Sequence, residues 1–426
     1  MVVVSIDGFR PEFYRDRSMP TPHLQEMYAK GVGAKEVTGV FPSVTYPSHT
    51  TLITGVTPRE HGVYYNTEIK EDGTAGNWIY DFKAIKTKTL WQAAKEKGLT
   101  TASVSWPVSV NAKYIDYNIP EFWSFENPRD RRGATAEKAN PQGLFEEVVQ
   151  NATGNLEIND YNLFSLSMDQ NLARIAGYIL RKYKPHFLTI HLPNTDGAQH
   201  REGREGVMVR KAISGADNAV GIIRDALQKA GIEEETTIIV TGDHGFVDVH
   251  SMISPNVILA EPGLYDQKEG KPSVFFFASG GAAFLHLGDK NEEETLRRIK
   301  RIFSKLPFEI RDSFEIVDED EIADRGGDPR VKLALTGAKG YSFNSSKFGN
   351  FISPYKGGGT HGHYPDFYDI ATGFIGFGKG MQENLTIDRM YLEDVAKIVA
   401  SLLGIELNQG INYYHSTLKG GSGLLD

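Results

Sequence analysis

The sequence predicts an α/β protein, built on a doubly wound, mostly parallel sheet with helices on both faces and a smaller α+β insert. Short apolar runs, typical of buried parallel strands, recur at residues 2–6, 99–105, 186–192 and 236–241. The last three each follow a helical stretch, at residues 89–98, 168–183 and 209–231. This alternation of strand and helix indicates a parallel sheet, whose ligands bind beyond the carboxyl ends of the strands.

Residues 251–359 carry a different pattern and are predicted to form the insert. They hold an apolar strand at 273–287, an amphipathic helix at 291–306 and short strands at 314–317 and 331–337. Residues 1–250 and 360–426 are then expected to form the α/β core. Between Trp123 and Gln142 the chain shows little periodicity, which favours an exposed loop that overhangs a site.

The composition excludes several classes of protein. The 426 residues are 40% hydrophobic and 24% charged, which is typical of a soluble globular protein. The net charge of -9 gives no broad basic field, so we expect no binding to nucleic-acid polymers. Because there is no cysteine, disulfides, thiolate metal sites and cysteine nucleophiles are excluded. No apolar run is long enough to predict a membrane span.

Acidic residues stand at or shortly after the ends of predicted core strands. They are Asp7 in SIDG, Asp196 in LPNTDGAQH and Asp243, followed by His244, in TGDHGF. A single aspartate at a strand end is often a turn residue or a helix cap. Because parallel strands end at one edge of their sheet, these side chains are expected to gather there.

Histidines extend this acidic cluster. Asp196 and His200 stand four residues apart, which places both on one face of a helix. Carboxylate and imidazole together suit a divalent cation such as zinc. Another histidine comes from GGGTHGHYP, where glycines let the backbone approach closely and either His361 or His363 points inward. The alternative is that His200 lies on the surface, His244 in a turn and the glycine run in a flexible loop.

Thr45, in FPSVTYPSHTTLITG, is the candidate nucleophile because it precedes an apolar segment that predicts a helix start. The alternative role is a helix cap, which is common for threonine at such a place. A neutral hydroxyl is a poor nucleophile, but coordination to a metal lowers its pKa. Amides at a helix N-terminus stabilise the anionic oxygens of a phosphoryl group. Phosphoryl chemistry therefore fits these residues.

Five motifs in order make the chain resemble the alkaline phosphatase superfamily, and within it the nucleotide pyrophosphatase/phosphodiesterase family. They are SIDGFRPEF, FPSVTYPSHTTLITGVTPREHGVYYN, PNTDGAQHREG, TGDHGF and GTHGHYP. Each motif is modest alone, but together they span nearly the whole chain. The resemblance implies an alkaline phosphatase-like core and a zinc-dependent phosphoric ester hydrolase.

Carried over by position, the resemblance implies two zinc ions and a covalent mechanism. The first zinc would be bound by Asp7, Asp243, His244 and Thr45, and the second by Asp196, His200 and His361. Thr45 would attack phosphorus and form a phosphothreonine, which water then hydrolyses. Asn66 matches the family's asparagine that donates to a nonbridging phosphate oxygen. The amide of Thr45 or Tyr46 would hold charge at the same oxygens.

The expected substrates are small phosphate diesters that contain a nucleotide. Monoesterases of the superfamily add a cation near the phosphate, and we find no clear match for it. The nearest candidates in predicted loops are Lys113, Arg129, Arg131 and Arg132. Tyr46 and Tyr65 are candidate substrate contacts, since an aromatic ring stacks on a base. His191 stands where relatives often carry tyrosine and is a third candidate contact.

Alternative functions remain open at this stage. A threonine-dependent phosphomonoesterase and a phosphonoacetate-type hydrolase share the ligand pattern, whereas a cofactor-independent phosphoglycerate mutase would require serine instead of Thr45. A catalytically silent relative that binds lipid or a protein partner is the alternative outside enzymes. The resemblance implies a periplasmic or secreted location, with a leader removed before the first strand, and a cytoplasmic location is the alternative.

Overall fold

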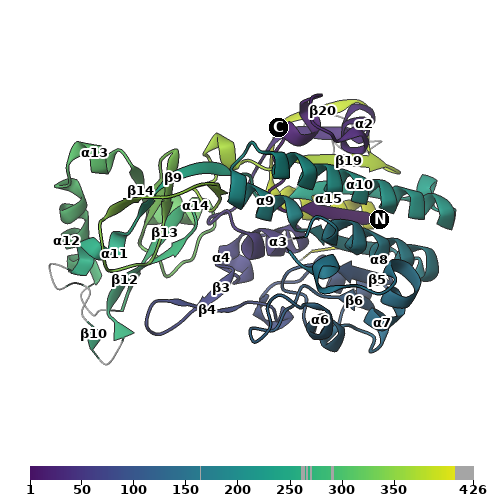
Figure 1. Ribbon diagram of the computed structural model, residues 1–426, viewed down its shortest axis with the longest axis horizontal. Coiled ribbons are helices and arrows are strands. Elements are labelled where there is room, and N and C mark those ends of the chain that lie inside the picture. Colours follow the sequence, from purple (N-terminus) through teal and green to yellow (C-terminus); the bar gives the residue numbers. More distant parts are fainter. Residues whose placement is uncertain (164, 261–263, 265–266, 269–270, 289–291, 408–426) are drawn as a thin grey trace.

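A mostly parallel sheet of eight strands forms the centre of the larger part of the molecule, in the order β20-β2-β19-β8-β1-β7-β5-β6 (Figure 1). The computed structural model describes all residues except 164, 261–263, 265–266, 269–270, 289–291 and 408–426. The strands are β1 (Val2–Ile6), β2 (Val32–Thr38), β5 (Thr101–Val104), β6 (Tyr117–Ile119), β7 (Phe187–Leu192), β8 (Thr237–Gly242), β19 (Phe374–Gly378) and β20 (Leu385–Tyr391). Only β19 runs antiparallel to its neighbours within this sheet. The predicted fold class is confirmed.

Helices cover both faces of this sheet, and strand β1 shows why. Its side chains alternate between the two faces, so Val2 and Val4 pack into one hydrophobic cluster and Val3 into the other. The first cluster includes α8 (Met168–Tyr183) and α10 (Val207–Ala230). The second includes α3 (Thr45–Thr54), α5 (Leu90–Glu96) and α15 (Leu392–Leu403). Burial on both sides explains why the core strands are continuous apolar runs.

A second, antiparallel sheet forms most of the insert, in the order β12-β13-β15-β14, beside the core in Figure 1. Its strands are β12 (Val274–Ser279), β13 (Ala282–Leu287), β14 (Phe314–Asp318) and β15 (Leu333–Gly337), and α12 (Glu292–Ser304) packs on it. The expectation of one strand at 273–287 was wrong, because the chain reverses at Gly280 and Gly281 into a hairpin. The predicted helix begins with Asn291, which lies outside the described residues.

A small third sheet joins the core and the insert. Strand β9 (Val247–Ile253) pairs with β16 (Gly340–Phe343), β17 (Ile352–Pro354) and β18 (Gly359–Thr360). The division into a core of residues 1–250 and 360–426 and an insert of 251–359 stays a prediction, and 408–426 lie outside the described residues.

Smaller elements are α1 (Glu12–Arg15), α2 (Pro22–Lys30), α4 (Pro58–His61), β3 (Thr67–Ile69), β4 (Ala75–Trp78), α7 (Leu144–Val148), α9 (Asn194–Glu202), α11 (Pro255–Ala260), α13 (Phe308–Arg311) and α14 (Glu319–Asp324).

Residues 125–129 form an exposed loop, as expected for the segment between Trp123 and Gln142, but the segment is not irregular and exposed throughout. It contains α6 (Arg132–Lys138), and the side chains of Trp123 and Arg131 are buried. The guanidinium of Arg131 lies 4.1 Å from the ring centroid of Trp123. This pair anchors the segment to the core, which a search for periodicity does not detect.

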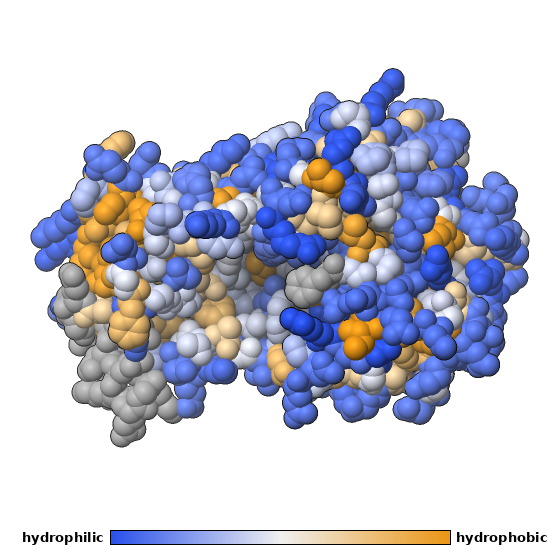
Figure 2. All heavy atoms as spheres, in the orientation of Figure 1, coloured by the Kyte–Doolittle hydropathy of each residue, from blue (hydrophilic) through white to orange (hydrophobic). Residues whose placement is uncertain are grey.

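The outer surface is mainly polar. Figure 2 shows hydrophilic residues over most of one face, with a hydrophobic area at the insert end. Among the described helices, none combines the length and the apolar character that crossing a bilayer requires.

Candidate active site

Three neighbouring parallel strands bring the acidic residues together. Strand β1 lies between β7 and β8, and the three run parallel. Asp7 follows the last residue of β1, and Asp243 follows the last residue of β8. Asp196 lies in the first turn of α9, which begins just after β7. Since adjacent parallel strands end at one edge, the three carboxylates reach the same site.

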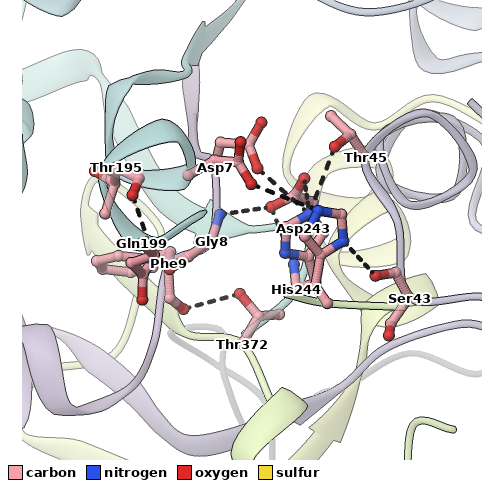
Figure 3. A network of polar contacts seen from close by, with 12 residues as sticks. Asp7, Gly8, Phe9, Ser43, Thr45, Thr195, Gln199, Asp243, His244 and Thr372 are labelled. Atoms are coloured by element: carbon pink, nitrogen blue, oxygen red, sulfur yellow. Dashed lines mark hydrogen bonds and ion pairs between the residues drawn. The ribbon is translucent and has the colours of Figure 1, made fainter. Parts of the chain in front are cut away.

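The first ligand group consists of Asp7, Asp243 and His244, all of them buried. The Nε2 atom of His244 lies 3.4 Å from Oδ1 of Asp7 and 3.2 Å from Oδ2 of Asp243. Figure 3 shows both carboxylates directed at this ring. The backbone N–H of Gly8 donates to Oδ1 of Asp243 at 3.0 Å, in a left-handed conformation with φ of +69° that favours glycine.

The second ligand group consists of Asp196, His200 and His361. Helix α9 places Asp196 and His200 one turn apart, as the spacing predicted, with Oδ1 of Asp196 and Nε2 of His200 3.2 Å apart. His361 follows β18, and its Nε2 is 3.5 Å from the same oxygen. The side chain of His200 is 41% exposed, whereas the first group is buried. The site therefore opens to solvent on the His200 side.

The three histidines are oriented in the same way. Nδ1 of His200 lies 3.0 Å from the carbonyl oxygen of Gly359, and Nδ1 of His244 lies 3.1 Å from that of Gly245. Nδ1 of His361 lies 3.1 Å from the carbonyl oxygen of Ser43. A carbonyl only accepts, so each Nδ1 carries the proton and each Nε2 presents its lone pair to the carboxylates. This is the arrangement of metal-binding histidines.

Buried oxygens without donors show that cations fit this site. Oδ1 of Asp7, Oδ1 of Asp196 and Oδ2 of Asp243 accept no hydrogen bond from any described residue. Burial and the charge of Asp196 raise the pKa of Asp7 well above its usual range, and burial and the charge of Asp7 do the same to the pKa of Asp243. Buried carboxylates without a partner are unfavourable, and a nearby positive charge would stabilise them. A divalent cation in each group would supply it.

Thr45 is the first residue of α3, beside the first ligand group. Its Oγ1 lies 3.5 Å from Nε2 of His244, and Figure 3 shows the hydroxyl directed at that ring. The side chain of Asn66 lies at the same helix start, where Oδ1 accepts the Tyr46 N–H at 2.8 Å. Because that bond occupies the oxygen, the NH₂ group of Asn66 is the end left to donate. The same bond occupies the N–H of Tyr46, which is one of the two backbone amides expected to bind phosphate oxygens.

Comparison with known proteins identifies the family. A sequence model of the "Type I phosphodiesterase / nucleotide pyrophosphatase" family matches residues 1–363. This chain belongs to that family. Ectonucleotide pyrophosphatase/phosphodiesterase family member 1 of Rattus norvegicus is 23% identical over 423 residues, which cover 95% of this chain and 40% of the relative. Family member 7 of Homo sapiens is 23% identical over 419 residues, which cover 96% of this chain and 81% of the relative.

Solved structures of relatives have the same fold. Human ectonucleotide pyrophosphatase/phosphodiesterase 5 superposes with a TM-score of 0.68 at 19% identity, covering 99% of this chain and 100% of that one. An inactive threonine-to-alanine variant of the murine protein, in complex with AMP, superposes with a TM-score of 0.68 at 20% identity, covering 98% and 99%. The chain spans about 40% of the length of the first curated relatives it matches.

The two tyrosines that were expected to contact substrate have buried side chains in this protein. Tyr46 is fully buried, and its hydroxyl donates to Glu121 Oε1 at 2.9 Å. Tyr65 is also buried and packs against Phe277 and Phe284 of the insert hairpin. Neither ring presents an open face to a base in this structure. Tyr65 instead holds the insert against the segment that carries Asn66.

The third expected contact and three of the four candidate cations have other partners in the structure. His191 is buried behind Asp7, with Nε2 3.1 Å from Asp7 Oδ2. Arg131 packs on Trp123, and Lys113 lies over the ring of Tyr114. Arg132 forms a two-atom contact with the carboxylate of Asp130. No phosphate-binding cation among these three is evident within the described structure.

Three site residues were not singled out from the sequence. Glu121 is 6% exposed and contacts His191 and Tyr46. Ser43 accepts the Gly362 N–H and donates to the carbonyl oxygen of His363, which ties the His361 segment to the start of α3. His49 is buried, and its Nδ1 lies 2.8 Å from the carbonyl oxygen of Thr45. A buried charge in an irregular segment gives little sequence signal, although Ser43 and His49 lie within the Thr45 motif.

Proposed function

We propose that this protein hydrolyses phosphate diesters that contain a nucleotide, with Thr45 as the nucleophile and two zinc ions as cofactors. The observation that carries the proposal is the position of the Thr45 hydroxyl. It lies at the start of α3, 3.5 Å from Nε2 of His244, beside two groups of buried carboxylates and imidazoles. Coordination to such a cation would lower the pKa of the hydroxyl and make it a nucleophile.

Each ligand group would hold one zinc ion. The first would use Asp7, Asp243 and His244 with Thr45, and the second Asp196, His200 and His361. When bound, the zinc ions would lower the pKa of the attacking hydroxyl or water and offset charge on phosphate oxygens. The lone pairs of the three Nε2 atoms and the three carboxylate oxygens without donors support this assignment.

The reaction would proceed in two steps on Thr45. Its oxygen forms a bond to phosphorus as the bond to the leaving oxygen breaks, which gives a phosphothreonine. A water molecule then attacks phosphorus from the side of the departed group and breaks the bond to Thr45, which releases a phosphate monoester and restores the hydroxyl. The NH₂ group of Asn66, oriented by the bond from Tyr46 N–H to its oxygen, would donate to a nonbridging oxygen in both steps.

The relatives support a nucleotide substrate. The curated names describe nucleotide pyrophosphatase/phosphodiesterases, and one solved relative holds AMP in an inactive threonine-to-alanine variant. The prefix "ecto" in those names agrees with the periplasmic or secreted location that the resemblance implied, which stays a prediction for this chain. Lys113, Arg131 and Arg132 each have another partner in the described structure, which favours diesters over monoesters, while Arg129 stays a candidate phosphate-binding cation.

The test compares hydrolysis of bis-p-nitrophenyl phosphate, p-nitrophenyl phosphate and the p-nitrophenyl ester of thymidine monophosphate, with zinc content assayed. Thr45→Ala is expected to lose at least about 10³-fold in kcat and keep its zinc. Thr54→Ala serves as the matched control, because that hydroxyl lies in the same helix and donates to the Thr50 carbonyl. A monoester preference, or full turnover by Thr45→Ala, would refute the proposal.

A further inference from the structure

His191 lies between two buried carboxylates. Its Nε2 is 3.1 Å from Oδ2 of Asp7, and its Nδ1 is 2.9 Å from Oε2 of Glu121. The side chain is 1% exposed, so water does not screen these contacts. Each ring nitrogen therefore lies within hydrogen-bond distance of a carboxylate oxygen. His191 therefore joins two acids that would otherwise repel each other.

Glu121 extends this chain of contacts to the nucleophile segment. Its second oxygen, Oε1, accepts the hydroxyl of Tyr46 at 2.9 Å. Tyr46 follows Thr45 directly in the first turn of α3. One buried carboxylate thus contacts both the residue behind Asp7 and the residue next to Thr45. The guanidinium of Arg131, buried over Trp123, lies in the same region.

The two oxygens of Asp7 have different roles as a result. Oδ2 is held by His191, whereas Oδ1 faces Nε2 of His244 at 3.4 Å and accepts no hydrogen bond from the described residues. His191 is also fixed in place, because it pairs in register with Ser5 of β1, two residues before Asp7. A contact on Oδ2 alone sets the rotation of the carboxylate, and it leaves Oδ1 directed into the first ligand group.

We infer that Glu121 and His191 are positioning residues, which aim Asp7 at the first metal and tie the Thr45 turn to the same support. The inference rests on the proposed function of the site, and it assigns each residue a separate effect. The His191 contact governs how firmly the first group holds its metal. The Tyr46 contact governs where the Thr45 hydroxyl stands, and it leaves the side chains of Asp7, Asp243 and His244 undisturbed.

Zinc binding to metal-stripped protein tests the first effect without any need for turnover. Competition with a chromophoric chelator gives the two zinc affinities of the wild type, His191→Leu and Glu121→Gln. Loss of a residue that orients a ligand typically weakens metal binding about 10- to 100-fold. We expect that loss for one of the two zinc ions in both variants, and no larger loss in the double variant, because both act through Asp7.

Tyr46→Phe tests the second effect. It removes one hydroxyl, and the expected result is a kcat lowered about fivefold with both zinc affinities unchanged. His61→Leu is the matched control for His191→Leu, because His61 is equally buried but contacts Thr51 and Val63 and no ligand group. If His191→Leu fails to fold, Glu121→Gln alone gives the metal-affinity test.

The outcomes separate this inference from the proposed function. Zinc affinities within about twofold of the wild type in His191→Leu and Glu121→Gln would overturn the inference, as would an equal loss in His61→Leu. A wild type that binds no zinc would instead overturn the proposed function. Zinc weakened in His191→Leu and Glu121→Gln, with only kcat lowered in Tyr46→Phe, would support the two roles as assigned.

Discussion

Replacing Asp243 by asparagine should stabilise the metal-free protein and reduce the stabilisation that zinc gives. Oδ1 of Asp243 accepts two backbone N–H groups, from Gly8 and His244, each at 3.0 Å. An asparagine oxygen keeps both bonds. Oδ2 has no donor among the described residues, so its charge is uncompensated without metal. Removing an uncompensated buried charge is expected to raise the free energy of unfolding by about 2–4 kcal/mol.

The sign of the pH dependence follows from the same contacts. Burial and the neighbouring Asp7 raise the pKa of Asp243 well above 3.8, so the folded protein holds this proton more tightly than the unfolded chain. The stability of the metal-free wild type therefore falls as pH rises above 3.8. The advantage of Asp243→Asn should be larger at pH 8 than at pH 5.

Urea unfolding with a chelator, and again with zinc, measures both halves of the prediction. Zinc at about 1,000 times its Kd stabilises the wild type by about 4 kcal/mol, and the variant gains less because it lacks a ligand. Asp225→Asn is the control, since the same change at an exposed helix position should alter stability by no more than about 0.5 kcal/mol. A metal-free Asp243→Asn protein less stable than the wild type would refute the reasoning.

Two further changes give sharp expectations. Gly358→Ala should lower zinc retention and kcat well below those of Gly357→Ala. Both glycines have positive φ, but a Cβ at Gly358 would lie 1.7 Å from the carbonyl oxygen of His200, and one at Gly357 would meet nothing within 4 Å. Equal losses in the two variants, measured by chelator competition and turnover, would show that the positive φ causes the loss and the contact with His200 does not. Asp169→Asn should stabilise the chelated protein at pH 8 by about 4 kcal/mol at most and much less at pH 5, because burial raises the pKa of Asp169 from 3.8 to about 7. The same difference in urea midpoint between Asp169→Asn and the wild type at both pH values would contradict this prediction.

The core strands could be predicted because a strand that is buried on both faces is a continuous run of apolar residues. β1 occupies the predicted residues, and β5, β7 and β8 lie within two residues of theirs. The carboxyl ends of neighbouring parallel strands lie at one edge of their sheet. Asp7, Asp196 and Asp243 could therefore be placed at that edge before any contact was known. These inferences need only local patterns and a general rule about sheets.

The remaining features depend on partners far away in the sequence. Glu121 stands 70 residues from His191, and no local pattern relates them. Trp123 and Arg131 bury each other in a segment without periodicity, so it was assigned to an exposed loop. The orientation of Tyr46 and Tyr65 depends on tertiary packing, since an aromatic residue beside a nucleophile serves either as a substrate contact or as core.

The insert is built into the site by the way its two ends are paired. Strand β18 pairs antiparallel with β9, so Gly359 lies opposite Asp248 and Thr360 opposite Val247. His361 consequently returns beside His244, and the two rings stack with centroids 3.6 Å apart. A long excursion between paired ends costs little extra loop entropy, which explains how so large an insert is accommodated. The same pairing means that the insert cannot shift against the core without moving His361, so the geometry of the second ligand group depends on how the insert packs.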